Sequence, residues 1–114
     1  MADYLVLTLD CLNLDVQSPF WCGALGYRHE GGVGQYRALV DPAGLQPKLL
    51  LQGVGEQKTA KNRLHIDLHV ADVEAEAGRL EALGAVRVQR VDEFGFFWMV
   101  MNDPEGNEFC IVPS

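Results

Sequence analysis

The segment RLHIDLHVAD, residues 63–72, alternates polar and apolar side chains. His65, Asp67 and His69 occupy every second position, and aliphatic residues stand between them. Successive side chains of a β-strand point to opposite faces of a sheet, so the pattern predicts a strand with one aliphatic face and one His–Asp–His face. Such a polar face suggests a pocket wall or a metal site, and it also fits a half-solvated strand with a His–Asp hydrogen bond.

A helix is predicted directly after this strand. Asp72 is a suitable N-cap, Val73, Ala77 and Leu80 recur at helical spacing, and Gly84 ends the pattern. Turns are expected at residues 92–95 and 103–106. The remaining strands of this half are predicted over residues 85–90, 96–102 and 107–112.

The first half of the chain shows the same order of elements. A strand is predicted over residues 4–10, followed by a helix that ends at Gly26. This helix begins either after Asn13 or after Ser18, which is a proper cap followed by Pro19 at the first helical position. Turns at Gly31-Gly32 and at residues 41–44 then separate three strands, predicted over residues 27–30, 34–40 and 47–52.

The two halves form an internal repeat. LVLTLDCLNLD aligns with LHIDLHVADVE, ALGY with ALGA, DPAG with DPEG and LLLQ with FCIV. We therefore predict a single α+β domain over residues 1–114, built from two pseudo-symmetric βαβββ modules. The modules span about residues 1–53 and 63–114, with a connector at about 54–62. Halves this small bury too little surface alone, so their sheets should form an open barrel around a central pocket, with the helices outside.

The alignment also predicts which side chains line that pocket. The first strands of the two halves place their alternating polar faces at matching positions, and the last two strands of the second half add Trp98 and Cys110. A histidine oriented by Asp67 is a plausible general base, with His65 and His69 as candidates. The predicted pocket residues are Thr8, Asp10, His65, Asp67, His69, Trp98 and Cys110.

Composition excludes some functions. The formal net charge is −7, which disfavours nucleic-acid binding because that role needs a basic face. No apolar run reaches the length of about 18 residues needed to span a membrane. The start MADYLVLTLD lacks the features of a signal peptide, and the odd number of cysteines fits reduced thiols. These features predict a cytoplasmic protein.

Two motifs carry a resemblance that covers essentially the whole chain. LHIDLHVAD, followed by ALGA, and the ending MNDPEGNEFCIV resemble the vicinal oxygen chelate (VOC) superfamily, which includes glyoxalase I, extradiol dioxygenases, and bleomycin and fosfomycin resistance proteins. The sequence is most similar to small glyoxalase-like domains of that superfamily. The resemblance implies a small-molecule ligand and a homodimer.

The resemblance also implies where a metal would bind. The four ligand positions of the superfamily's metal enzymes fall at Val6, Leu50, His65 and Cys110, and two of these residues are aliphatic. Asp67 lies about 6.6 Å from His65 by strand rise, so both could reach one ion. The candidate ligands are therefore His65, Asp67 and Cys110, for a divalent metal such as zinc or another transition metal, and zinc suits this set better than magnesium or manganese.

Three functions follow from this reading. The first is a glyoxalase-like small-molecule-binding protein without the family's full metal site, with an aromatic or cationic ligand. The alternative is a metal-dependent VOC enzyme of the lyase, isomerase or dioxygenase type, with an atypical site around His65. The third is a scaffold for protein contacts that retains the fold without a ligand.

Overall fold

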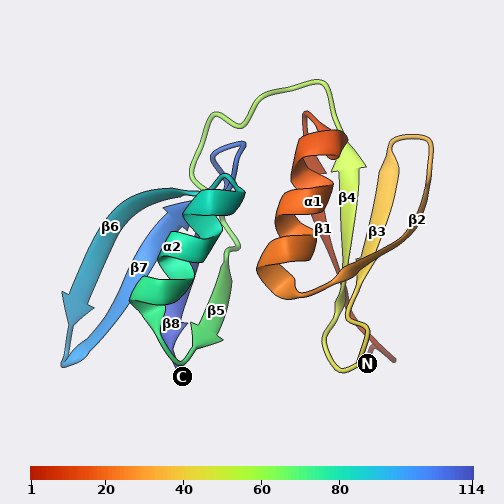
Figure 1. Cartoon of the computed structure of the whole chain (residues 1–114). Helices are drawn as coiled ribbons and strands as arrows, with labels where there is room; N and C mark the ends of the chain where they lie inside the picture. Colours follow the sequence, from red (N-terminus) through yellow and green to blue (C-terminus); the bar gives the residue numbers. More distant parts are fainter. The chain divides into compact units, whose positions relative to one another are not determined.

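A computed structural model describes all residues, 1–114, and divides the chain into two compact units. The first unit comprises Met1–Gln57 and the second Lys58–Ser114. Each unit contains one four-stranded sheet with one helix packed against it (Figure 1). The predicted α+β class and the βαβββ order of each half are confirmed.

The first unit has strand order β1-β4-β3-β2, in which β1 and β4 run parallel and the other pairs antiparallel. Helix α1 contacts β3, β4 and β2. Phe20 and Trp21 of this helix are buried and meet edge to face, with ring centroids 5.2 Å apart. Its elements are β1 (Val6–Cys11), α1 (Leu14–Leu25), β2 (Arg28–Val33), β3 (Tyr36–Val40) and β4 (Lys48–Gly53).

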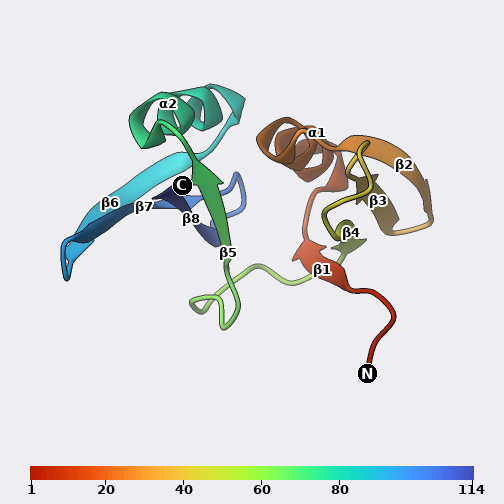
Figure 2. The same cartoon turned by 90° about the horizontal axis from the view of Figure 1, so that it is seen from below.

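The second unit repeats this topology with strand order β5-β8-β7-β6, again with a parallel outer pair. Helix α2 lies across one face of its curved sheet (Figure 2). Ala77 and Leu80 of the helix are fully buried. The elements are β5 (Ile66–Val70), α2 (Val73–Leu83), β6 (Val86–Glu93), β7 (Phe96–Asn102) and β8 (Glu108–Pro113).

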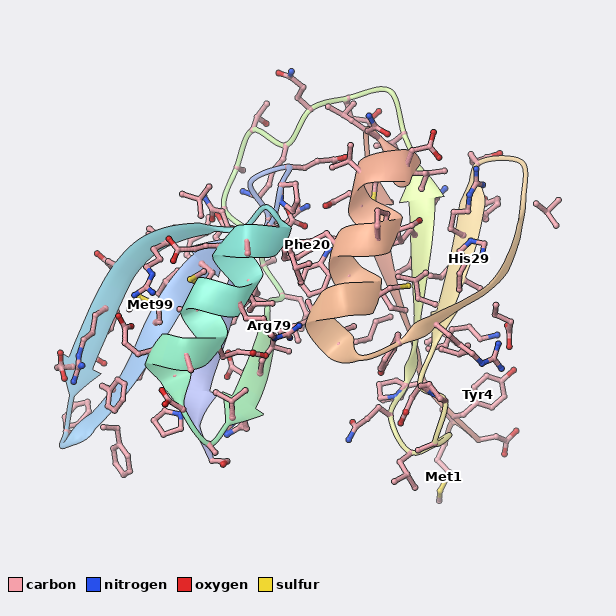
Figure 3. All side chains as sticks on the ribbon, in the orientation of Figure 1. Met1, Tyr4, Phe20, His29, Arg79 and Met99 are labelled. Carbon is pink, nitrogen blue, oxygen red and sulfur yellow. The ribbon has the colours of Figure 1, made fainter.

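Strand alternation separates the two faces of this second sheet. On β8, Phe109 and Ile111 are buried in the unit's core, while Cys110 points to the opposite face. On β7, Met99 lies on the helix side (Figure 3) and Trp98 on the other. The face away from α2 therefore carries the polar and aromatic side chains that the sequence predicted for a pocket.

Both helices begin at asparagine or aspartate caps. The side chain of Asn13 accepts hydrogen bonds from the backbone N–H groups of Asp15 and Val16, so α1 begins directly after it and contains Pro19. Of the two starts that the sequence left open, the structure has the earlier one. The side chain of Asp72 accepts from the N–H of Ala75, as predicted for the second helix.

The DPEGN segment, residues 103–107, is a structural turn. The carboxylate of Asp103 is 1% exposed and accepts hydrogen bonds from the backbone N–H groups of Glu105 and Asn107 and from the Asn107 side chain. Because these bonds fix the chain as it enters β8, they set which residues of that strand face away from the helix. The motif thus identifies the fold without taking part in chemistry.

Several predicted boundaries are wrong by one to three residues. The first strand begins at Val6, and Tyr4, placed in it from the sequence, is 81% exposed. Strand β2 continues through Gly31 and Gly32 to the turn after it, because a bulge there keeps both glycines in the ladder. Strand β6 likewise extends to Glu93, past the predicted turn start. No helix is long and apolar enough to cross a membrane.

Candidate functional site

The second unit contains a cavity of about 640 Å³ on the sheet face away from α2. All four of its strands or their flanks contribute side chains. One wall is polar and the remainder is dominated by valines and an indole. The lining residues are Lys61, His65, Asp67, Val88, Gln89, Trp98, Val100, Asn102, Glu108, Cys110 and Val112.

The polar wall is a three-residue cluster formed by His65, Asp67 and Cys110, which we call the HDC cluster. Asp67 and Cys110 are direct register partners in the parallel pair β5–β8, so their side chains leave the sheet on the same face. Nε2 of His65 lies 3.2 Å from a carboxylate oxygen of Asp67. One ligand atom from each of the three residues lies within 4.8 Å of the others.

Cys110 is a protonated thiol in this setting. Its burial raises the pKa of the thiol, and the charge of Asp67 and a hydrogen bond to it raise the pKa further, while Lys61 opposes the shift. A thiol with a raised pKa is a poor nucleophile. The HDC cluster therefore does not support covalent catalysis by Cys110.

A second carboxylate at the cavity, Glu108, is fully engaged with the connector. It accepts hydrogen bonds from Nζ of Lys58 at 2.9 Å and from the backbone N–H of Asn62 at 2.9 Å. Burial raises the pKa of this carboxyl, but the Asn62 and Lys58 hydrogen bonds outweigh the burial and hold the pKa at about 2. This Glu108 clamp fixes the connector segment that carries Lys61 and leads into His65.

The structure brings together four of the predicted pocket residues: His65, Asp67, Trp98 and Cys110 line the cavity. His69 is exposed on β5 and is not part of the lining. Thr8 and Asp10 lie on β1 of the first unit and do not line this cavity of the second unit. Leu64 was predicted on the aliphatic strand face, but it precedes β5 and is 76% exposed.

Sequence reasoning missed several lining residues. Glu108 and Val112 alternate with Cys110 on β8, and Val100 and Asn102 alternate with Trp98 on β7. The two-residue period of each strand was a sufficient signal for all four. Lys61 had no such signal, because it lies in the connector outside any regular element.

The residues present decide which metal arrangement is chemically reasonable. The four-position set implied by the superfamily does not fit, since Val6 and Leu50 offer no ligand atom. The HDC cluster does offer one imidazole nitrogen, one carboxylate oxygen and one sulfur at mutual distances compatible with a single ion. That mixture of donors is typical of zinc and related transition metals.

Comparison with known proteins identifies the family. Residues 6–112 match the glyoxalase-like domain family, so the chain belongs to this family. A search of curated proteins found no match.

Solved structures share the fold at low sequence identity. A glyoxalase/bleomycin resistance protein/dioxygenase family enzyme from Burkholderia phytofirmans aligns with TM-score 0.78 and 17% identity, covering 98% of each chain. The fosfomycin resistance protein FosX of Listeria monocytogenes, as a mutant complexed with Mn(II) and 1S,2S-dihydroxypropylphosphonic acid, aligns with TM-score 0.80 and 16% identity, covering 98% of this chain and 90% of FosX. A superfamily member from Sphaerobacter thermophilus aligns with TM-score 0.73 and 19% identity, covering 100% of this chain and 98% of that one.

Proposed function

We propose that the chain is a glyoxalase-like small-molecule-binding protein whose ligand occupies the cavity of the second unit. The observation that carries the proposal is a cavity of about 640 Å³ that combines an indole and valines with a few polar groups. Small-molecule sites in proteins are typically concave, mostly apolar and 300–1,000 Å³ in volume, with a small number of orienting polar groups. Trp98 supports an aromatic ligand, because ring stacking adds to the area buried.

Filling the cavity should abolish binding. Val88 lies on the edge strand β6, lines the cavity and is 51% exposed, so Val88→Trp places an indole in the cavity without disturbing the core. We expect this variant to lose at least about tenfold in affinity for a ligand found by a thermal-shift screen of aromatic compounds. Wild-type protein with about a hundredfold excess of ligand over its Kd should gain about 2.7 kcal/mol in stability.

Leu83→Trp is the matched control. Leu83 lies on α2, on the other side of the sheet, is 40% exposed and does not line the cavity. It should therefore bind the ligand as wild type does. A screen in which no aromatic compound stabilises the wild-type protein would contradict the proposal, as would equal binding by the two tryptophan variants.

A second candidate function is a metal-dependent enzyme with an atypical site at the HDC cluster. The observation in its favour is the 4.8 Å grouping of His65, Asp67 and Cys110. A zinc or other transition-metal ion bound there would supply a Lewis acid to substrate oxygens. Without metal chemistry, His65 beside Asp67 remains a candidate general base, whereas His69 lies outside the cavity lining.

The metal proposal predicts a thiolate ligand. Titration of untagged protein with Co²⁺ should produce a sulfur-to-cobalt charge-transfer absorption that Cys110→Ser removes. Because the thiol must lose its proton to bind, and its pKa is raised, apparent affinity should increase as pH rises. Cys22→Ser, a half-buried thiol of α1, is the control and should leave the band unchanged. A wild-type protein without the band excludes this site.

We also propose a cytoplasmic homodimer. Three free cysteines suit a reducing compartment, and cell fractionation would test the location. Exposed apolar side chains support self-association, among them Val33 on β2 and Phe96 on β7, at 82% and 72% exposure. Light scattering should give twice the chain mass of 12.6 kDa, and a single chain mass at micromolar concentration would contradict dimerisation.

A further inference from the structure

The charged groups of the cavity differ in whether they already have partners. Asp67 faces Nε2 of His65 at 3.2 Å and hydrogen-bonds with Cys110. Glu108 is held by Lys58 and by the backbone of Asn62. Glu108 therefore spends its acceptor capacity on the protein itself and is 18% exposed, whereas the Asp67 side chain stays 47% exposed beside His65 and Cys110. A cationic ligand at Asp67 would have to compete with the His65 imidazole and the Cys110 thiol for that carboxylate.

Lys61 is the one charged lining residue without a salt bridge or side-chain hydrogen bond. It lies between two residues of the Glu108 clamp, since Lys58 and Asn62 both bind that carboxylate. The clamp thus anchors this segment before Lys61 through the Lys58 side chain and after it through the Asn62 backbone N–H, and Lys61 itself lines the cavity.

Most of the other walls are apolar. Val88, Val100, Val112 and Trp98 come from three strands and give the cavity surfaces that suit a ring or an aliphatic body. The net charge of the chain, −7, would favour cations at long range. At physiological ionic strength that field is screened over about 8 Å. The charge of a bound ligand is therefore set by the charged side chains of the cavity itself.

We infer that the cavity takes an apolar ligand carrying one carboxylate, with the ring or chain against Trp98 and the valines and the carboxylate paired with Lys61. This ligand class rests on the proposed binding function. It differs in charge from the cationic ligand expected from the sequence. Lys61 is then the residue that sets specificity, while the HDC cluster forms another polar part of the cavity lining.

Three probes of similar shape test the charge preference. Hydrocinnamate carries a carboxylate, hydrocinnamyl alcohol is neutral, and phenylpropylamine is cationic at neutral pH. Titrations followed by amide chemical shifts would give each Kd. Hydrocinnamate should bind roughly fivefold more tightly than the other two, as expected for one partly exposed ion pair.

Two single substitutions test whether Lys61 causes the preference for the carboxylate probe. Lys61→Gln should bind the three probes equally, with the loss confined to hydrocinnamate. Arg63→Gln removes the same charge from an exposed neighbour outside the cavity lining and should keep the fivefold preference. Equal binding of all probes by the wild type, or a preference retained in Lys61→Gln, overturns the ligand class alone. Binding of no probe at all overturns both the ligand class and the cavity as a binding site.

Discussion

At Glu108, burial and hydrogen bonding act in opposite directions on a single carboxyl group. Burial alone would raise the pKa, yet the Asn62 N–H and the Lys58 ammonium together bring it to about 2. The side chains of Lys58 and Glu108 are 21% and 18% exposed, so this ion pair is better shielded from water than a surface pair. The clamp therefore contributes to stability as well as to the placement of the connector.

The variant Glu108→Gln should lower the free energy of unfolding by about 2 kcal/mol at neutral pH, as expected for hydrogen bonds to a charged group. The folded-state pKa lies below the ordinary value of 4.5, so the carboxylate's contribution is present above about pH 4.5 and is lost as pH falls through about 2. Urea unfolding at several pH values would measure this. The difference between wild type and variant should shrink steadily below pH 4.5.

Glu93→Gln provides the control for that experiment. Glu93 is exposed on β6 and makes no salt bridge or side-chain hydrogen bond. Its substitution should change stability by no more than about 0.5 kcal/mol at any pH. A Glu108→Gln variant as stable as Glu93→Gln at pH 7 would show that the clamp does not stabilise the fold.

The arrangement of the HDC cluster could be predicted from sequence only in part. His65 and Asp67 followed from alternation within one segment. Their proximity to Cys110 depends on the β5–β8 register, in which Asp67 faces Cys110, and 43 positions separate these two residues in sequence (110 − 67). The grouping of Cys110 with His65 and Asp67 was predicted only from the resemblance to the superfamily's ligand positions. The raised pKa of the thiol follows mainly from its burial, which no sequence pattern displays.

Among the elements, strand identity was predictable and hairpin geometry was not. The pair Gly31-Gly32 resembled a turn, but a Cβ at Gly32 would collide with the carbonyl oxygen of Tyr36 on the neighbouring strand. Glycine is thus needed there for close strand approach. The two-residue turn of the second hairpin is Phe94-Gly95, with Phe94 at φ +53° and 92% exposed. That conformation is uncommon for a bulky residue, so the sequence did not indicate Phe94 as a turn residue, and the turn was predicted to begin at Asp92.

Helix α1 illustrates a conflict between two valid local signals. Ser18-Pro19 is a good helix start by residue preference, and Asn13 is another. The structure has the earlier cap, and the longer helix adds the fully buried Gln17 to the face that carries Phe20 and Trp21.

At the scale of the whole chain, the repeat preserved architecture while the two units diverged in chemistry. The β1–β4 pair places Thr8 opposite Leu50, and the corresponding β5–β8 pair places Asp67 opposite Cys110. Sequence comparison of the halves predicted the order of elements in both units, and the strand order of the sheets comes from the structure. The comparison could not predict that the cavity lining would include a connector lysine, because that position depends on contacts of the Glu108 clamp about 50 residues away.

The position of β5 at the edge of its sheet has a consequence for the order of events during synthesis. This strand pairs with β8 alone, and β8 is the last strand of the unit to leave the ribosome. Residues 58–70 are therefore translated well before any backbone partner or clamping carboxylate exists for them. Non-local pairing of this kind is formed late and leaves hydrophobic surface unprotected meanwhile. Nascent chains stalled before Glu108 should thus lack the cavity entirely. The second unit then stays accessible to chaperones until β8 has been synthesised.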